Sequence, residues 1–148
     1  MSPDKRIVVR PLEESEIPAM VKVWRSSGLS YRPKGRDSPA RLRRQWRADP
    51  ELFLGAFVNG KVAGVALLSH DGRKGWINRL AVMPEHQRKG IARSLIARSE
   101  QVFLKRGIRI FCVHIEAHSP ASMVLFAESG YCREDLIHYY TKRVSKEY

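Results

Sequence analysis

Six consecutive residues, Gln87 to Ala92, have the residue types and spacing of an anion-binding turn. They follow the apolar residues Leu80-Ala81-Val82, which read as a strand, and they open a long amphipathic helix. Free backbone N–H groups meet at a helix N-terminus, where the helix dipole favours negative charge. Gly90 and Ala92 let a ligand approach the backbone closely. The pattern predicts a binding site for a diphosphate group.

Polar residues alternate with apolar ones in a second segment, residues 108–117. If this segment is a strand, Cys112, His114 and Glu116 share one of its faces. An imidazole or a carboxylate can accept a proton in a reaction. His114 and Glu116 are therefore two candidate general bases. The alternative is that both only contact substrate or water at the wall of a cleft.

Hydrophobic periodicity and turn residues predict the elements that position these groups. Asn59-Gly60 predicts a β-hairpin, and Ser38-Pro39 predicts the start of a helix. The expected order is β-α-α-β-β-β-α-β-α-β-β, which gives an α/β fold with a mixed sheet of about seven strands and about four helices covering both faces. One domain is expected to span residues 1–148. Strands are expected at 7–10, 52–58, 61–69, 76–82, 108–117, 131–133 and 136–144, and helices at 16–25, 38–48, 88–105 and 119–130.

The chain is strongly basic, with 27 Lys and Arg against 15 Asp and Glu and a net charge of +12. Such a charge attracts polyanions, so it fits nucleic acid, a phosphate-rich cofactor, an acidic substrate or a ribosomal partner. The excess of Lys and Arg is also consistent with a host whose proteins are basic in general. The basic residues form no recognisable recognition helix, which makes nucleic acid the weaker interpretation.

Several classes of protein are not supported by the sequence. No apolar run has the length of a membrane span, and the first residues lack the apolar region of a secretory signal. Cys112 and Cys132 form neither a disulfide framework nor a zinc pattern, and the histidines lack metal-ligand spacing. We therefore expect a cytoplasmic protein with no metal and no membrane partner.

The predicted element order, and residues 77–131 in particular, resemble the GNAT family of acetyl-CoA-dependent N-acetyltransferases. The family signature Val-x-Pro-x-x-Arg/Gln-x-x-Gly-x-Gly/Ala is met at Val82, Pro84, Gln87, Gly90 and Ala92. A later family segment, roughly Asn-x-x-Ala-x-x-Leu-Tyr-x-x-x-Gly-Phe, is met in part by Ser119, Ser122, Leu125, Phe126, Gly130 and Tyr131. The resemblance implies a mostly antiparallel sheet that is splayed in the middle.

Two branches of the family share further features with the chain. The turn at residues 71–76 is similar to that of the YpeA-like proteins. Other features are similar to the RimI-like enzymes, which acetylate protein N-termini. The sequence does not decide between the two. Dimers are common in the family, so a homodimer is one expectation, although no residue pattern specifies an interface.

The resemblance implies acetyl-CoA as cofactor and suggests where it binds. The backbone from Gln87 to Ala92 would hold the diphosphate, with charge added by Arg88, Lys89 and Arg93. The backbone from Leu80 to Val82 would bind the pantetheine arm, and the Val82 N–H would polarise the thioester carbonyl. The full expected set is Leu80, Ala81, Val82, Gln87, Arg88, Lys89, Gly90, Ile91, Ala92, Arg93, Ser119, Ser122 and Phe126. A helix cap would by itself explain Ser119.

The proton donor for the leaving thiolate is the open part of the chemistry. Family members often carry a tyrosine where this chain has Phe126, and phenylalanine donates no proton. Three outcomes remain: the thiolate leaves unassisted, Tyr139 or Tyr140 substitutes, or catalysis is lost. The first is favoured because a thiol has a pKa of only about 8.5. Phe126 would then pack beside the sulfur, and Tyr139 stays a candidate catalytic residue. The alternative for Tyr139-Tyr140 is an aromatic pair in a closing strand.

The most consistent function is transfer of an acetyl group from acetyl-CoA to a primary amine by direct attack in a ternary complex. The acceptor is a protein N-terminus or lysine, or a small amine. In this fold the first two helices and their loop usually form one acceptor wall. That wall would carry the basic residues Arg32, Lys34, Arg36, Arg41, Arg43, Arg44 and Arg47, unless these form only a solvated face. The competing hypothesis is a non-catalytic module that binds acyl-CoA or a polyanion.

Overall fold

The computed structural model describes residues 6–148. Its regular elements are β1 (Ile7–Pro11), α1 (Ile17–Ser26), α2 (Pro39–Ala48), β2 (Phe53–Val58), β3 (Lys61–His70), β4 (Lys74–Val82), α3 (Ile91–Lys105), β5 (Ile110–Cys112) and α4 (Pro120–Glu128), with short 3-10 turns at Glu14–Glu16, Pro50–Leu52 and Pro84–His86. The four expected helices and the first four expected strands are confirmed to within a few residues. In the described residues no helix is long and apolar enough to cross a membrane.

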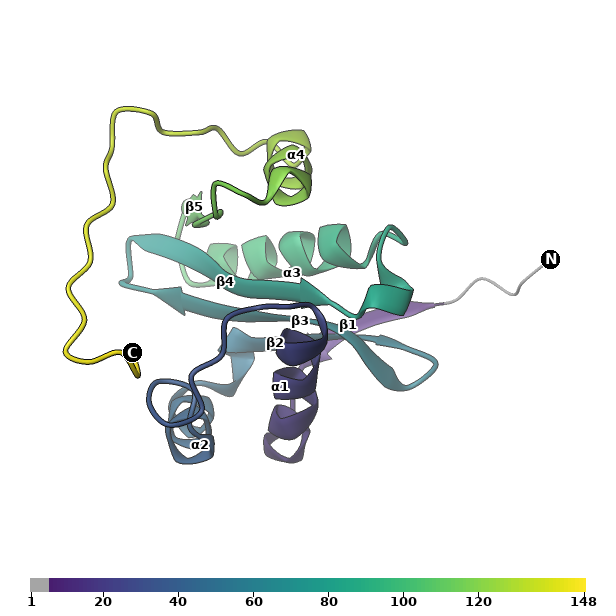
Figure 1. Cartoon of the computed structure of the whole chain (residues 1–148). Helices are drawn as coiled ribbons and strands as arrows, with labels where there is room; N and C mark the ends of the chain where they lie inside the picture. Colours follow the sequence, from purple (N-terminus) through teal and green to yellow (C-terminus); the bar gives the residue numbers. More distant parts are fainter. Residues whose placement is uncertain (1–5) are drawn as a thin grey trace.

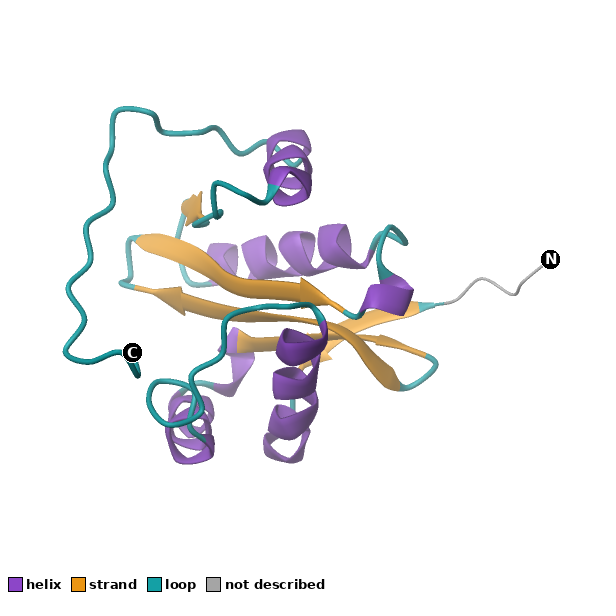
Figure 2. Ribbon diagram, in the orientation of Figure 1, coloured by secondary structure: helices purple, strands orange, loops and turns teal. Residues whose placement is uncertain are grey.

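The sheet has five strands in the order β1-β2-β3-β4-β5. The first four are antiparallel neighbours, and β5 runs parallel to β4. The α/β fold and the mixed sheet are therefore confirmed. Helices α1 and α2 lie on one side of the sheet, and α3 and α4 lie on the other (Figures 1 and 2).

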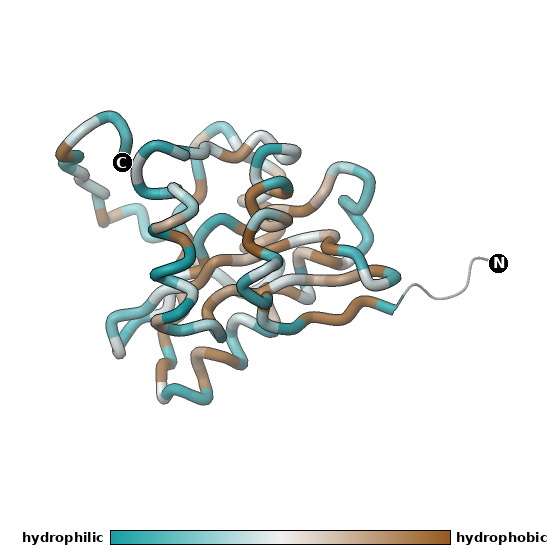
Figure 3. The backbone as a smooth tube through the Cα atoms, turned by 90° about the horizontal axis from the view of Figure 1, so that it is seen from below, coloured by the Kyte–Doolittle hydropathy of each residue, from teal (hydrophilic) through white to brown (hydrophobic). Residues whose placement is uncertain are grey.

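Alternation along the strands builds a hydrophobic core on each face. In β2, Leu54 and Ala56 are buried in the cluster that includes α3, whereas Phe53 and Phe57 are buried against α1. Successive strand side chains point to opposite faces, so a strand covered on both faces is apolar throughout. Figure 3 shows apolar stretches along the strands inside the fold and hydrophilic residues in many of the loops.

The last strands depart from the expectation. The strand predicted at 108–117 forms only over Ile110–Cys112, where it pairs with Lys74–Trp76. Beyond that point β4 contains a bulge, because Arg79 and Leu80 together lie opposite Ala66. A bulge bends its strand and ends regular pairing. The splay of the sheet stays a prediction.

The two closing strands predicted at 131–133 and 136–144 are wrong. Residues 131–148 form no strand and run as an extended segment from α4 to the vicinity of α2 (Figure 2). Leu136 is 96% exposed and Tyr140 is 88% exposed. β-propensity describes side chains that fit a half-buried sheet, and here no neighbouring edge buries them. The count of about seven strands is accordingly too high.

Candidate functional site

The turn between β4 and α3 has the backbone that the sequence predicts for an anion site. Arg88 and Gly90 adopt left-handed conformations, with φ of 61° and 83°. Because of this geometry, α3 begins at Ile91 and not at the expected Arg88. The first N–H that bonds within the helix is that of Ser94, which donates to the Gly90 carbonyl at 3.1 Å. The N–H groups before it at the helix N-terminus are therefore available to a ligand.

Side chains of the turn add positive charge. Arg88 and Lys89 are exposed beside Gly90. Arg93 was expected to join them, but it forms an ion pair with Glu128, so its charge is already compensated. The Gln87 side chain donates to the Val82 carbonyl at 3.3 Å and ties the turn to the end of β4. Exposed donors and cations at a helix N-terminus fit the diphosphate of coenzyme A.

The residues expected to bind the pantetheine arm lie at the end of β4. Ala81 and Val82 pair with Val65 and Gly64 of β3 on one edge. On the other edge the pairing with β5 stops at Trp76. The backbone of Leu80 to Val82 thus has an edge that no described strand occupies, and an extended ligand can hydrogen-bond to such an edge.

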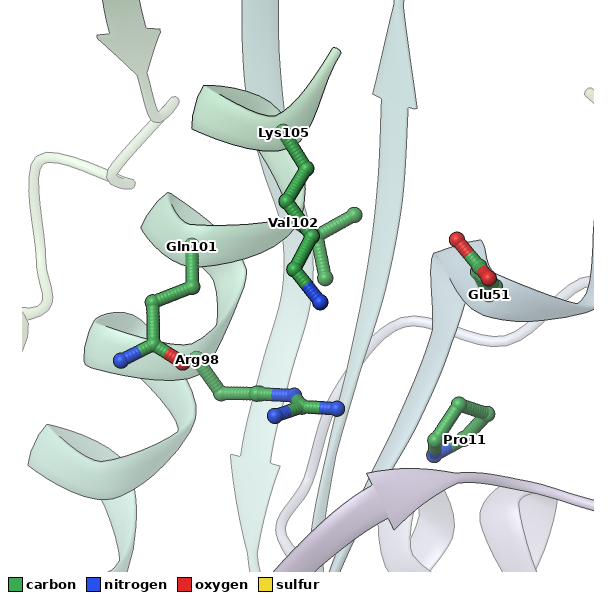
Figure 4. Close-up of a pocket in the computed structure, with 6 residues that line it drawn as sticks. All are labelled: Pro11, Glu51, Arg98, Gln101, Val102 and Lys105. Carbon is green, nitrogen blue, oxygen red and sulfur yellow. The ribbon is translucent and has the colours of Figure 1, made fainter.

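A cavity of about 400 Å³ adjoins this part of β4. Its wall combines four segments: the loop after α1, the middle of β4, the segment after β5 and the first turns of α4. The predicted residues that line it are Leu80, His114, Glu116, Ser119, Ser122 and Phe126. A hollow of about 60 Å³ between α3 and the chain near Pro11 and Glu51 contains none of the predicted site residues (Figure 4).

His114 is exposed at this cavity and contacts two aromatic rings. Its imidazole stacks on Trp76 with ring centroids 4.5 Å apart, and Tyr139 lies on it at 4.4 Å. Tyr139 is therefore close to His114, although it is not among the described residues that line the cavity. Glu116 is exposed, and its Oε2 lies 2.8 Å from His118 Nε2. The structure thus brings both candidate bases to one cavity.

The residues of α4 differ from their expected roles in one respect. Ser119 stands at the N-cap of α4, but its side chain makes no capping hydrogen bond. Its hydroxyl instead donates to Ser122 Oγ at 3.0 Å. The capping explanation for Ser119 is therefore wrong. Phe126 is 3% exposed and packs edge-on against Tyr131, with centroids 5.1 Å apart, and its place beside the thioester sulfur stays a prediction.

Two other groups near the cavity are unsuited to proton transfer or attack. Burial raises the pKa of the Cys112 thiol, so its thiolate is disfavoured as a nucleophile. Burial, together with the hydrogen bond that Tyr131 donates to Glu100 at 2.8 Å, raises the pKa of that phenol above its usual range. Tyr131 therefore stays protonated and anchors the end of α4 to α3.

An arginine that was not among the predicted site residues lines the same cavity. Arg79 lies at the bulge of β4 with φ of 50°, a conformation that costs of order 1 kcal/mol or more for a residue with a Cβ. Its Nη2 is 2.9 Å from Asp37 Oδ2, and its guanidinium lies over Trp24, 4.6 Å from the ring centroid. Burial lowers the pKa of Arg79, and Asp37 opposes that shift. The sequence signal that could have identified Arg79 as a site residue is its position as an arginine within the apolar strand Trp76–Val82.

Of the described basic residues expected on the acceptor wall, only one, from the loop after α1, lines the cavity. Arg36 lines the cavity, but no arginine of α2 does. Arg41 donates to the Tyr148 hydroxyl at 2.6 Å, and Arg47 pairs with Glu14 at 2.6 Å. In the part of the chain that is described, no cluster of side chains is suited to holding a metal ion.

Comparisons with known proteins agree with this geometry. Residues 18–131 match the acetyltransferase (GNAT) family. An N-acetyltransferase of Yersinia pestis is 28% identical over 129 residues, which cover 87% of this chain and 90% of the relative. The PaiA N-acetyltransferase of Thermoplasma acidophilum in complex with coenzyme A superposes with a TM-score of 0.77 at 21% identity, covering 89% and 93% of the two chains. The aminoglycoside N-acetyltransferase AAC(6')-Iy in complex with CoA gives a TM-score of 0.72 at 16% identity, covering 97% and 99%.

Proposed function

Since the chain belongs to the acetyltransferase (GNAT) family and is an acetyl-CoA-dependent N-acetyltransferase, we propose that it acetylates a small primary amine held in the cavity beside His114. The amine attacks the thioester directly while both substrates are bound. The observation that carries this proposal is the continuity of β4. One strand contributes Leu80 to the cavity and ends at Val82, and the anion-binding turn follows it after the short 3-10 turn Pro84–His86.

Acetyl-CoA is expected to run along this strand. The N–H groups at the start of α3 bind the diphosphate together with Arg88 and Lys89, because those two side chains are exposed and positively charged. The unpaired edge from Leu80 to Val82 binds the pantetheine arm. When it is bound, acetyl-CoA supplies an activated acetyl group, and the Val82 N–H is the donor we assign to its carbonyl oxygen.

We assign His114 as the group that accepts a proton from the acceptor amine. Its ring lines the cavity, stacks on Trp76 and contacts the tilted ring of Tyr139. Glu116 is the second candidate, and its carboxylate contacts His118, whereas His114 has aromatic rings that orient it. Tyr139 contacts His114 and acts as a positioning residue. The thiolate leaves without a proton donor, in keeping with the buried, apolar Phe126 at the cavity wall.

A small acceptor is favoured over a protein N-terminus or lysine. Tyr139 and Tyr140, the pair expected to clamp a peptide, do not line the cavity within the described chain, whereas Arg36 and Arg79 do. A cavity wall with two arginines disfavours an aminoglycoside. That is the acceptor class stated in the name of the structural neighbour AAC(6')-Iy. Because no tyrosine clamp supports a RimI-like activity, we place the chain nearer the YpeA-like branch. Its Asp71 accepts hydrogen bonds from the Arg73 and Lys74 N–H groups, both at 2.8 Å, and so stabilises the turn shared with that branch.

We further propose that residues 1–148 act as one domain in a reducing, cytoplasmic compartment. The free thiols of Cys112 and Cys132 support that setting. A homodimer stays a prediction, which the mass in solution would test.

Two measurements test the proposed function separately. Acetyl-CoA at 100 times its Kd should stabilise the protein by about 2.7 kcal/mol, which appears as a higher Tm. Thiol release with a panel of primary amines should then identify an acceptor. Absence of any Tm shift would refute the donor site. A Tm shift with no thiol release from any small amine or peptide would refute the assigned reaction.

A further inference from the structure

Two arginines at the cavity share a single carboxylate. Arg36 Nε and Arg79 Nη2 both donate to Oδ2 of Asp37, at 3.4 and 2.9 Å. The backbone N–H of Arg32 donates to the same oxygen at 2.8 Å. Asp37 is 4% exposed and does not itself line the cavity. One negative charge therefore faces two guanidinium groups, which leaves an excess positive charge at the wall.

Arg79 also has donor capacity that the protein does not use. Its Nη1 is buried and has no hydrogen-bond partner within the described residues. A buried donor without a partner is costly, so such a group usually signals a missing ligand or water. Trp24 and Asp37 already fix the guanidinium plane, so a ligand that binds it meets a preorganised group.

Arginines outnumber acidic groups on the cavity wall. Glu116 is the only acidic side chain among the described residues that line the cavity, against Arg36 and Arg79. Arg36 and Arg79 come from the loop after α1 and from β4, and their shared contact with Asp37 Oδ2 brings the two guanidinium groups close together. Guanidinium groups recognise carboxylates through pairs of parallel N–H···O bonds.

We propose that Arg79 and Arg36 form a carboxylate-binding subsite, so that the acceptor is a small amine that also carries a carboxylate. This inference rests on the proposed function and names its substrate class. The carboxylate binds at Arg36 and at the Arg79 guanidinium, since both residues line the cavity, and the amine faces His114 in the same cavity. A volume of about 400 Å³ accommodates a molecule of amino-acid size.

Matched acceptor pairs test the subsite directly. Thiol release is measured with amino acids and with their primary amides, which keep the amine and lose the charge. The expected kcat/KM is about 10- to 100-fold higher for the carboxylate form, the range of one charge-assisted hydrogen-bond set. An aminophosphonate added to the panel reports whether any anion suffices, and activity equal to that of the amino acid would overturn the choice of carboxylate.

Two variants and a control separate binding from structure. Arg36→Gln and Arg79→Gln should each raise KM for the carboxylate acceptor about 10-fold or more and leave the amide unchanged. Arg36→Gln is the milder change, because the Arg36 side chain is 34% exposed. Arg44→Gln removes the same charge from an exposed position on α2 that does not line the cavity, and it should have no effect.

The outcomes distinguish this inference from the proposed function. Equal use of acids and amides by the wild-type protein would overturn the subsite and leave the acetyltransferase reaction intact. Equal loss of both activities in Arg36→Gln would assign the arginine pair a structural role and overturn the subsite. If acetyl-CoA binds but no amine gives thiol release, the proposed function and this inference are both overturned.

Discussion

The imidazole of His114 stacks on the indole of Trp76, with ring centroids 4.5 Å apart and an interplanar angle of 28°. Trp76 is the last residue of β4 that pairs with β5, so the stack lies where the two strands part. This contact fixes the His114 ring at the wall of the cavity. A base held in this way is preorganised for proton transfer.

Replacing His114 by alanine should therefore lower kcat by about 10²- to 10⁴-fold, the usual contribution of a general base. KM for acetyl-CoA should stay within about threefold, since His114 lies outside the diphosphate turn. Trp76→Leu should lower kcat less, because the imidazole is kept but loses its stack. His138→Ala is the matched control, as His138 is exposed and is not among the cavity-lining residues. A large loss in Glu116→Gln with normal activity in His114→Ala would move the base to Glu116.

The anion-binding turn could be predicted from sequence because its signals are local. A strand, a glycine that must adopt positive φ and a helix start all lie between Val82 and Ala92. The contact between Arg79 and Asp37 has no such local signal. It joins β4 to the loop before α2, and only the packing of α1 over the sheet brings them together.

The limit of local signals also explains the end of the chain. Residues 136–144 have the composition of a strand, yet strand formation depends on a partner edge that lies elsewhere in the chain. The helices were predicted better because an amphipathic helix is specified by its own periodicity. Ser119 is a further case in which a local signal is insufficient. It is a residue type that favours capping and it stands at the N-cap of α4, yet its hydroxyl is hydrogen-bonded to Ser122 and not to the helix backbone.

Gly90→Ala should weaken acetyl-CoA binding. A side chain at φ of 83° is strained by about 1–2 kcal/mol, and relief of that strain moves the N–H groups of the turn. We expect KM for acetyl-CoA to rise about 10-fold. Gly72→Ala is a matched control, because Gly72 has φ of 84° and, as at Gly90, an added Cβ meets no atom within 4 Å. Both variants should lose similar stability in urea, and an equal KM in the two would contradict the assignment of the turn.

The ion pair between Asp49 and Arg106 should make the free energy of unfolding depend on pH in the acidic range. Arg106 Nη2 donates to Asp49 Oδ1 at 2.9 Å, and this hydrogen bond lowers the pKa of Asp49 below its ordinary value. A carboxyl whose folded pKa is lowered stabilises the protein above its unfolded pKa of about 3.9 and loses that effect as the pH falls through the folded pKa. Asp49→Asn should therefore cost about 0.5–1 kcal/mol at pH 6, a value that allows for solvent screening.

That cost should shrink toward zero as the pH is lowered to about 2, because the wild-type carboxyl is then protonated as well. Urea unfolding of both proteins across this range measures it. Glu51→Gln is the comparison, since Glu51 also pairs with Arg106, at 3.2 Å, but its side chain is 70% exposed. A difference between Asp49→Asn and the wild type that is constant with pH would show that the ionised carboxylate is not the source of the stabilisation.

The extended segment after α4 should be the first part of the protein that trypsin cuts. Lys142 and Arg143 are exposed, and their neighbour Val144 is 98% exposed. Cleavage needs a locally unfolded backbone, which this segment already offers, whereas sites on α3 such as Lys105 require the helix to open. Mass spectrometry of a limited digest should show cuts after Lys142 or Arg143 at least about 100-fold faster than cuts within α3. Protection equal to that of α3 would instead mean that residues 136–144 pair as a sheet edge, as their composition predicts.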